Sequence, residues 1–252
     1  MTIGAQLYTL RSYTQTQRDL AETLRRVAKM GYNAIQLSAI GPIAPKIIRE
    51  MADDNGLDIV LTHMPEARIL ADTQHVIEEH QVLGCHYIGL GSMGERYRDA
   101  AWVDRFPLDF EGPMREIRDA GMLFMYHNHA FEFEPLRDGR RIADVLSQIP
   151  SELMGITLDT YWVQYAGGDV MAWIERWKDR LHCVHLKDMT IRGFENRMAP
   201  VGAGNMNFAA IVARLAELGV TKHLLVEQDN CYGEDAFDCM QRSCDFIGTL
   251  LK

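Results

Sequence analysis

Clusters of basic residues and long apolar runs are both absent from this sequence. Its 252 residues include 26 lysines and arginines against 35 aspartates and glutamates, which gives a formal net charge of −9. This acidic balance predicts no general affinity for nucleic acid and no electrostatic attachment to a membrane. The opening MTIGAQLYTLRSYTQ lacks the pattern of a signal peptide, and no later run is long enough to span a bilayer.

Paired cysteine motifs are also missing. The five cysteines are odd in number and none has CxxC spacing. This usage is typical of a reducing compartment and argues against a structural zinc site. We therefore expect a cytoplasmic protein whose cysteines are free thiols.

What the sequence does contain is an alternation of strand-like and helix-like segments. The expected strands are Ile3–Tyr8, Ala34–Leu37, Ile59–Thr62, Tyr87–Leu90, Leu123–Tyr126, Gly155–Leu158, Cys183–His185 and Leu224–Val226. Between them lie amphipathic stretches such as QRDLAETLRRVAKMG and NFAAIVARLAELGV, with apolar residues at three- and four-residue spacing.

Strand–helix alternation predicts parallel strands joined by right-handed crossovers. Eight such units in a chain of this length match a single-domain (β/α)8 TIM barrel over residues 1–252. A doubly wound open sheet is the competing fold, but the segment after the first strand, YTLRSYTQ, lacks the glycines that often mark it. The poorly patterned stretch 91–112 is expected to be a long loop over the active face.

Polar and ionisable residues gather just past the expected strands. In chain order they are Gln6 and Tyr8, Gln36, His63, Gly91 and Ser92, His127 and His129, Asp159, His185 with Lys187 and Asp188, and Glu227 with Gln228 and Asp229. Barrel enzymes carry their reactive groups at these strand ends.

Asp159, His185 and Glu227 form the sharpest set, because each closes a run of apolar residues. Singly, each is better explained as a helix cap, a core histidine or a salt-bridge partner. Together, at the ends of three consecutive strands, they suit a divalent cation such as manganese, magnesium, cobalt or zinc.

The sequence resembles the xylose isomerase-like TIM barrels, the superfamily of sugar phosphate isomerases and epimerases that also contains endonuclease IV. The resemblance covers essentially the whole chain. It is carried by the order and spacing of IGAQLYTLR, MGYNAIQLS, LTHMP, YHNHAFEFE, LDTYW, VHLKDM, PVGAGNMNF and LLVEQDN.

The resemblance implies a metal held by Asp159, His185 and Glu227. Many relatives supply the fourth ligand as a glutamate that ends strand five, where this sequence has His127. His127 is therefore one candidate for the fourth ligand, and Glu132, which would reach back to the metal, is the other.

The resemblance also implies roles in catalysis and substrate binding. His129 takes the place of the base that removes a proton beside a carbonyl, and an imidazole near its reference pKa of about 6.5 suits that role. Glu227 is the alternative base, and Lys187 is expected to hold an oxyanion or hydroxyl. The expected substrate contacts are Gln6, His63, Glu132 and Trp162, of which Trp162 departs from the histidine common in relatives and would form an apolar wall.

The activity implied is that of a metal-dependent isomerase or epimerase of a small keto-sugar or related polyol, acting through a metal-stabilised enediolate. A dehydratase or lyase shares the first step and then expels a β-substituent. An endonuclease IV-type phosphodiesterase and a non-catalytic sugar-binding barrel are the remaining readings. Such barrels commonly dimerise, so the resemblance allows a homodimer.

Overall fold

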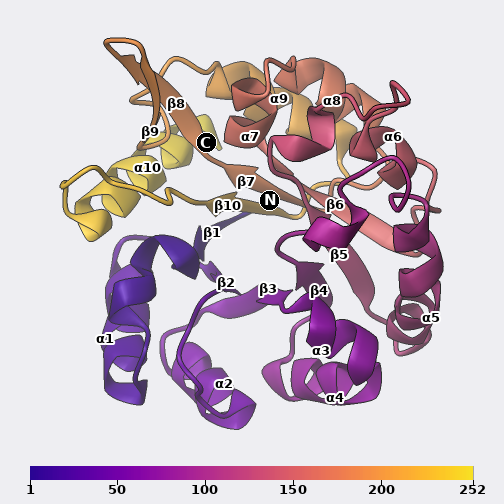
Figure 1. Ribbon diagram of the computed structural model, residues 1–252. Coiled ribbons are helices and arrows are strands. Elements are labelled where there is room, and N and C mark those ends of the chain that lie inside the picture. Colours follow the sequence, from indigo (N-terminus) through magenta and orange to yellow (C-terminus); the bar gives the residue numbers. More distant parts are fainter. Residues whose placement is uncertain (252) are drawn as a thin grey trace.

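The computed structural model, which describes residues 1–251, is a closed barrel of eight parallel strands and confirms the predicted TIM barrel (Figure 1). The strands follow one another around the barrel in the order β1-β10-β7-β6-β5-β4-β3-β2. They are β1 (Thr2–Gln6), β2 (Ala34–Leu37), β3 (Asp58–Met64), β4 (Tyr87–Leu90), β5 (Leu123–His127), β6 (Met154–Asp159), β7 (Cys183–Leu186) and β10 (His223–Val226).

Helices surround the barrel (Figure 1). They are α1 (Gln17–Lys29), α2 (Pro45–Asp54), α3 (Glu66–Ala71), α4 (Thr73–Leu83), α5 (Arg105–Asp119), α6 (Ile142–Leu146), α7 (Thr160–Tyr165), α8 (Val170–Arg176), α9 (Phe208–Leu218) and α10 (Ala236–Leu250). Three short 3₁₀ helices accompany them: η1 (Leu7–Tyr13), η2 (Glu95–Tyr97) and η3 (Phe131–Phe133). Within residues 1–251, none of the helices has the length and apolar character needed to cross a membrane.

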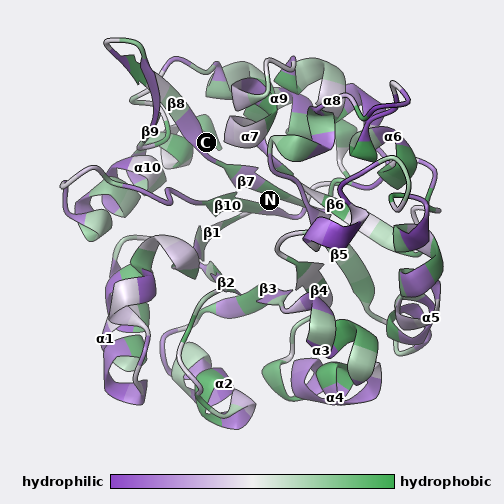
Figure 2. Ribbon diagram, in the orientation of Figure 1, coloured by the Kyte–Doolittle hydropathy of each residue, from purple (hydrophilic) through white to green (hydrophobic). Residues whose placement is uncertain are grey.

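Helix α1 illustrates how local sequence places these elements. The Thr16 side chain accepts a hydrogen bond from the backbone N–H of Asp19 and so caps the first turn. Leu20, Leu24 and Val27 recur at helical spacing and are fully buried against the barrel. Figure 2 shows the same separation of apolar and polar residues: the strands are mostly hydrophobic, and the helices carry both hydrophobic and hydrophilic residues.

Side chains from alternate strand positions fill the barrel. An apolar layer contains Ala34, Val60, Leu61, Tyr87, Met125, Cys183 and Leu225. Glycines make room for its larger members, since a Cβ on Gly4 would lie 2.5 Å from Leu225 Cδ2 and one on Gly155 would lie 2.4 Å from Met125 Sδ. This layer forms the floor on which the polar strand ends rest.

Three features differ from the sequence-based expectation. The first strand ends at Gln6, so Tyr8 belongs to η1 and not to a strand. Helix α5 begins at Arg105, so only the first part of the 91–112 stretch is loop. An antiparallel hairpin of β8 (Asp188–Arg192) and β9 (Glu195–Ala199) follows β7 and was not predicted, because most residues of its sequence, DMTIRGFENRMA, are exposed or half-buried.

Asp188 organises the chain that leaves this hairpin. Its carboxylate accepts hydrogen bonds from the backbone N–H groups of Gly202 and Gly204 at 3.0 and 2.9 Å, and from Met189 and Met206 at 2.7 and 3.3 Å. A Cβ on Gly204 would lie 2.4 Å from Asp188 Oδ1. The glycines therefore shape a loop around a buried carboxylate, which agrees with a structural role for this G-x-G.

We predict that Asp188→Ala lowers the free energy of unfolding by about 3 kcal/mol, because four buried backbone donors lose a charged acceptor. Asp188→Asn, which keeps one acceptor oxygen, should lose less. Urea denaturation measures both, with Asp179→Ala at an exposed position as the control. Equal stability of Asp188→Ala and Asp179→Ala would contradict the assigned role of the carboxylate.

Candidate metal centre

A polar layer lies directly above the apolar floor of the barrel. Because strand side chains alternate between faces, the residue two positions beyond each floor residue again faces inward. The inward-facing polar side chains in this layer are Gln6, Gln36, His63, His127, Asp159, His185 and Glu227.

Four of these residues could hold a metal ion. One ligand atom from each of His127, Asp159, His185 and Glu227 lies within 4.8 Å of all the others, and all four residues are buried. His127 Nε2 lies 3.3 Å from Asp159 Oδ2, and His185 Nδ1 lies 2.9 Å from Glu227 Oε2. The structure thus brings His127, rather than Glu132, together with the three residues that the strand ends indicated.

Hydrogen bonds on the far side of each ligand fix its orientation. Gln36 Oε1 lies 2.7 Å from His185 Nε2, so this nitrogen donates and Nδ1 is left with a lone pair. The Gly91 carbonyl plays the same part for His127, at 2.9 Å from Nδ1. Gln6 donates to Glu227 Oε1 at 2.6 Å and leaves Oε2 directed at the cluster.

Asp159 is oriented by backbone groups. Its Oδ1 accepts a hydrogen bond from the N–H of Trp162 and so caps the start of α7. One oxygen of Asp159 therefore caps the helix, and the other is left for the cluster. Asn128 Oδ1 accepts from the Asp159 N–H at 2.9 Å and links the ends of β5 and β6. Only Oδ2 therefore faces the other three ligands.

Lys187 lies fully inside this cluster. Its Nζ is 3.1 Å from Asp159 Oδ2, 3.1 Å from Glu227 Oε2 and 2.9 Å from Asp229 Oδ1. Burial disfavours its charge, but the three carboxylates outweigh burial and raise the pKa of Lys187. The ammonium in turn holds the pKa values of Asp159 and Glu227 below their usual range, although burial alone would raise them.

The charges of the cluster fit a divalent cation. Three carboxylates face a single ammonium, which leaves two negative charges uncompensated in a buried site. Consistent with this excess, burial and the neighbouring Glu227 raise the pKa of Asp229 to about 7. His185 Nδ1 and Glu227 Oε2 are both buried and face each other at 2.9 Å, and Glu227 Oε2 also faces Lys187 Nζ at 3.1 Å. A divalent ion would supply the missing charge and would be coordinated by these inward-facing atoms.

Glu132 does not face the cluster, because other groups hold both of its carboxylate oxygens. Tyr126 Oη donates to Glu132 Oε1 at 2.7 Å, and the His129 N–H donates to Oε2 at 2.8 Å. Both oxygens are thus engaged, and the side chain is fully buried. This placement does not support Glu132 as a metal ligand or substrate contact. The residue holds the turn that carries His129.

His129 differs from the expectation that its pKa stays near the reference value. Burial, followed by the neighbouring His127 ring, lowers the pKa of His129 to about 3, so the imidazole is neutral at pH 7. Its ring packs between Phe131 and Trp162, with centroids 5.6 and 5.7 Å away. Nδ1 is buried without a hydrogen-bond partner, so this ring has an unused nitrogen beside the cluster.

A pocket of about 230 Å³ opens above the four ligands. Its lining is Gln6, Tyr8, Ser38, His63, Gly91, His127, His129, Trp162, Lys187, Glu227 and Asp229. The structure therefore brings the expected contacts Gln6, His63 and Trp162 into one pocket with His129 and Lys187.

Sequence reasoning did not assign a role to Asp229, Gln36 or Asn128. Asp229 and Gln36 were visible as strand-end polar residues, which was the available signal. Asn128 stood between two histidines that drew more attention. Their roles became clear only from their partners on other strands: Lys187 for Asp229, His185 for Gln36 and Asp159 for Asn128.

The fold is that of a known class of barrel. The family model of the xylose isomerase-like TIM barrel matches residues 24–247, and the chain belongs to that family.

Several known proteins are similar along most of their length. An inosose dehydratase from Geobacillus kaustophilus is 21% identical over 261 residues, which cover 86% of this chain and 80% of that protein. The crystal structure of a sugar phosphate isomerase/epimerase from Parabacteroides distasonis superposes with a TM-score of 0.82 at 24% identity, covering 100% of this chain and 96% of the other. A xylose isomerase-like TIM barrel protein from Mycobacterium smegmatis, in complex with magnesium, gives a TM-score of 0.77 at 16% identity, covering 99% and 96% of the two chains.

The buried Glu132 carboxyl predicts a pH-dependent stability. Burial raises the pKa of Glu132 from 4.5 to about 7, so the folded protein keeps this proton to a higher pH than the unfolded chain does. Stability should therefore fall as pH rises from about 4.5 to about 7, with a contribution from Glu132 of about 3 kcal/mol.

Glu132→Gln should remove this contribution, whereas Glu134→Gln at the exposed neighbouring position should retain it. The measurement is urea denaturation of the three proteins at pH 5 and pH 8, compared as differences so that other titrating groups cancel. If the free energy of unfolding of Glu132→Gln changes between pH 5 and pH 8 by the same amount as that of the wild type, this carboxyl does not titrate as proposed.

Proposed function

We propose that this protein is a divalent-metal-dependent isomerase or epimerase of a small keto-sugar or related polyol, which acts by removing a proton next to a carbonyl. The observation that carries the proposal is the convergence of four buried ligand residues beside His129, whose Nδ1 has no partner. Family membership and the similarity to a sugar phosphate isomerase/epimerase support it.

His127, Asp159, His185 and Glu227 would hold the ion. When bound, a divalent ion acts as a Lewis acid that polarises a carbonyl and so eases removal of the neighbouring proton. The ligand chemistry, two imidazoles and two carboxylates, suits manganese, magnesium, cobalt or zinc.

His129 is the base that the geometry favours. Its imidazole borders the pocket, is neutral at pH 7 and has no hydrogen-bond partner at Nδ1, whereas Lys187 is held protonated by its carboxylate partners. Glu227 is less suited, because its oxygens already face Gln6, His185 and Lys187. Asp159 and Glu227 favour the charged form of His129, and they would stabilise the imidazolium that forms on proton transfer.

The pocket suits a small polar substrate. Its volume of about 230 Å³ is below the roughly 300 Å³ typical of the smallest drug-sized sites. Trp162 supplies an apolar wall, with Lys187 Nζ 5.4 Å from its ring centroid. The Gln6 amide has a second N–H besides the one donated to Glu227 and can donate it to a substrate hydroxyl, whereas the three N–H groups of Lys187 face three carboxylates.

A dehydratase is the second candidate, and the placement of Asp229 favours it. Asp229 lines the pocket on the side of Lys187, at 2.9 Å from Nζ, while His129 lines it as well. An acid and a base that border one pocket can remove a proton and assist the departure of a β-hydroxyl. The similarity to an inosose dehydratase supports the same outcome.

Metal binding by the four residues can be measured without any substrate. Titration calorimetry with manganese should give one site per chain, and His185→Ala and Glu227→Gln should each weaken binding at least about 100-fold, since each removes a ligand. His75→Ala and Glu217→Gln, at exposed positions, are the matched controls. A protein that binds no manganese, cobalt or zinc would instead favour a sugar-binding barrel without metal chemistry.

Proton abstraction by His129 can be followed by exchange of substrate hydrogen in deuterated water, using a panel of keto-sugars and a keto-inositol. We expect His129→Gln to slow exchange by about 10² to 10⁴-fold while manganese affinity stays within a few-fold of wild type. The products separate the two candidates, because isomerisation conserves the formula and dehydration loses water. Full exchange activity in His129→Gln would assign the base to another residue.

A further inference from the structure

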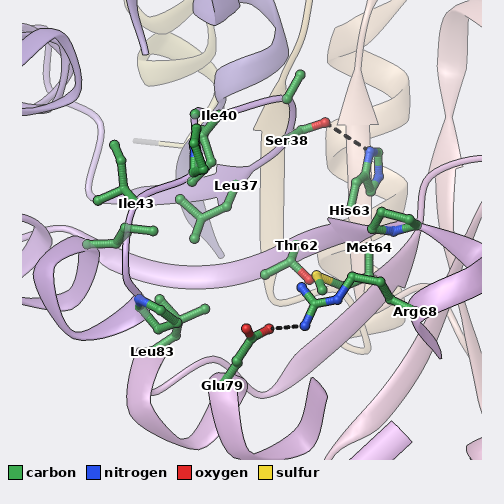
Figure 3. Close-up of a pocket in the computed structure, with 16 residues that line it drawn as sticks. Leu37, Ser38, Ile40, Ile43, Thr62, His63, Met64, Arg68, Glu79 and Leu83 are labelled. Atoms are coloured by element: carbon green, nitrogen blue, oxygen red, sulfur yellow. Dashed lines mark hydrogen bonds and ion pairs between the residues drawn. The ribbon is translucent and has the colours of Figure 1, made fainter. Parts of the chain in front are cut away.

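The pocket of about 230 Å³ that His129 and Lys187 line is here called the reaction pocket. A larger cavity, of about 430 Å³, lies beside it. It runs outward from the ends of β2 and β3, between the loop that follows β2 and the helices α2, α3 and α4 (Figure 3). No role in the proposed reaction has been assigned to it.

The lining of this cleft is mainly apolar. Its aliphatic members are Leu37, Ile40, Ile43, Ile48, Met64 and Leu83. In Figure 3, Leu37, Ile40 and Ile43 lie on one side, and Arg68 and Glu79 lie on the other. The Arg68 guanidinium is 3.0 Å from the Glu79 carboxylate, so the charged end of the cleft is neutralised. The cleft therefore suits an uncharged apolar group better than a phosphate.

The cleft and the reaction pocket share a wall. Ser38 and His63 line both, and Ser38 Oγ is 3.2 Å from His63 Nδ1. On β3, His63 faces the barrel, where its ring centroid lies 5.1 Å from that of His127. The adjacent residues Thr62 and Met64 line the cleft outside the barrel. His63 Nε2 is buried without a hydrogen-bond partner, so only Nδ1 of this ring is engaged at the shared wall.

The outer wall of the cleft is held in a strained conformation. Ala39 has φ of 53°, in the left-handed region that costs a non-glycine residue about 1 kcal/mol or more. Gln15 fixes the loop, because its Nε2 donates to the Ala39 carbonyl at 2.8 Å. Gly41 packs so closely on the Gln15 backbone that a Cβ would lie 1.9 Å from the Gln15 carbonyl oxygen. The cleft is thus preformed before any ligand arrives.

We propose that this cleft binds a neutral apolar substituent, such as an aryl aglycone, carried by the sugar whose ring lies in the reaction pocket. The substituent would pass Ser38 and His63 and pack against Ile40 and Ile43. The proposal rests on the proposed function for the position of the sugar ring. It adds that the preferred substrates are keto-sugars whose ketone is on a ring carbon and which carry a bulky apolar group in a glycosidic bond, rather than free or phosphorylated sugars.

The test compares phenyl and methyl β-glycosides of glucose, galactose and xylose, bound to the protein with manganese added and measured by calorimetry. At least one phenyl glycoside should bind about tenfold or more tightly than its methyl counterpart, because only the phenyl ring reaches the apolar cleft. Ile43→Glu, and independently Ile40→Glu, should reduce this preference to less than about threefold. Val82→Glu, at an exposed position on α4 outside the cleft, is the matched control and should keep it.

The outcomes separate this inference from the proposed function. A phenyl preference that Ile43→Glu removes and Val82→Glu keeps supports the cleft, even if no keto-sugar exchanges its proton and the proposed reaction fails. Equal binding of phenyl and methyl glycosides throughout the panel overturns the cleft assignment, even if proton exchange is observed. A phenyl preference that survives both Ile40→Glu and Ile43→Glu also overturns it. Thermal unfolding of each variant establishes that it is folded.

Discussion

One buried ammonium holds the centre of this protein together. Lys187 Nζ lies within 3.1 Å of carboxylate oxygens from Asp159, Glu227 and Asp229, which come from the ends of two different strands and the loop after β10. Without this positive charge, three carboxylates would share a desolvated site, which is strongly unfavourable. One ammonium is nevertheless too little for three carboxylates, and the remaining negative charge is what makes the cluster a candidate for a divalent ion.

A supporting layer makes this charge cluster geometrically specific. Each candidate ligand has one atom directed inward and another atom hydrogen-bonded to a partner that contributes no ligand atom: Gln36 for His185, Gln6 for Glu227 and the Gly91 carbonyl for His127. Such partners select the tautomer of each imidazole and the rotamer of each carboxylate. Glu132 supports His129 in a similar way, because its carboxylate accepts a hydrogen bond from the His129 backbone N–H and so fixes the turn that carries this residue. His127, which stands where a strand-five glutamate was expected, is thus oriented in the same way as the other candidate ligands.

Two adjoining cavities divide the region above the barrel into a polar and an apolar part. The reaction pocket is lined by ionisable side chains, whereas the cleft between α2 and α4 is lined mainly by aliphatic ones. Ser38 and His63 separate them, and both residues come from strand ends that also support the polar layer. A substrate with a polar ring and an apolar substituent matches this division, since each part would lie against surface of its own kind.

Local sequence by itself determined the barrel and the residues that end its strands. The alternation of strand and helix patterns depends on backbone geometry within a few residues, so it can be read without tertiary information. The same holds for the inward position of Asp159, His185 and Glu227, which follows from the two-residue period of a strand. The β8–β9 hairpin was not predicted, because its strands are mostly exposed or half-buried and so do not show the apolar pattern of a core strand.

Only the tertiary structure decided which atoms meet. Gln6 and Glu227 are 221 residues apart and meet where β1 and β10 close the barrel, whereas Gln36 and His185, 149 residues apart, form a hydrogen bond across its interior. Burial lowers the pKa of His129, and hydrogen bonds from Tyr126 and the His129 N–H hold Glu132 away from the cluster. Neither effect is visible in a linear sequence pattern. Side-chain orientation and desolvation depend on neighbours brought together by barrel closure, and for that reason the site's residues could be read from the sequence while its geometry could not.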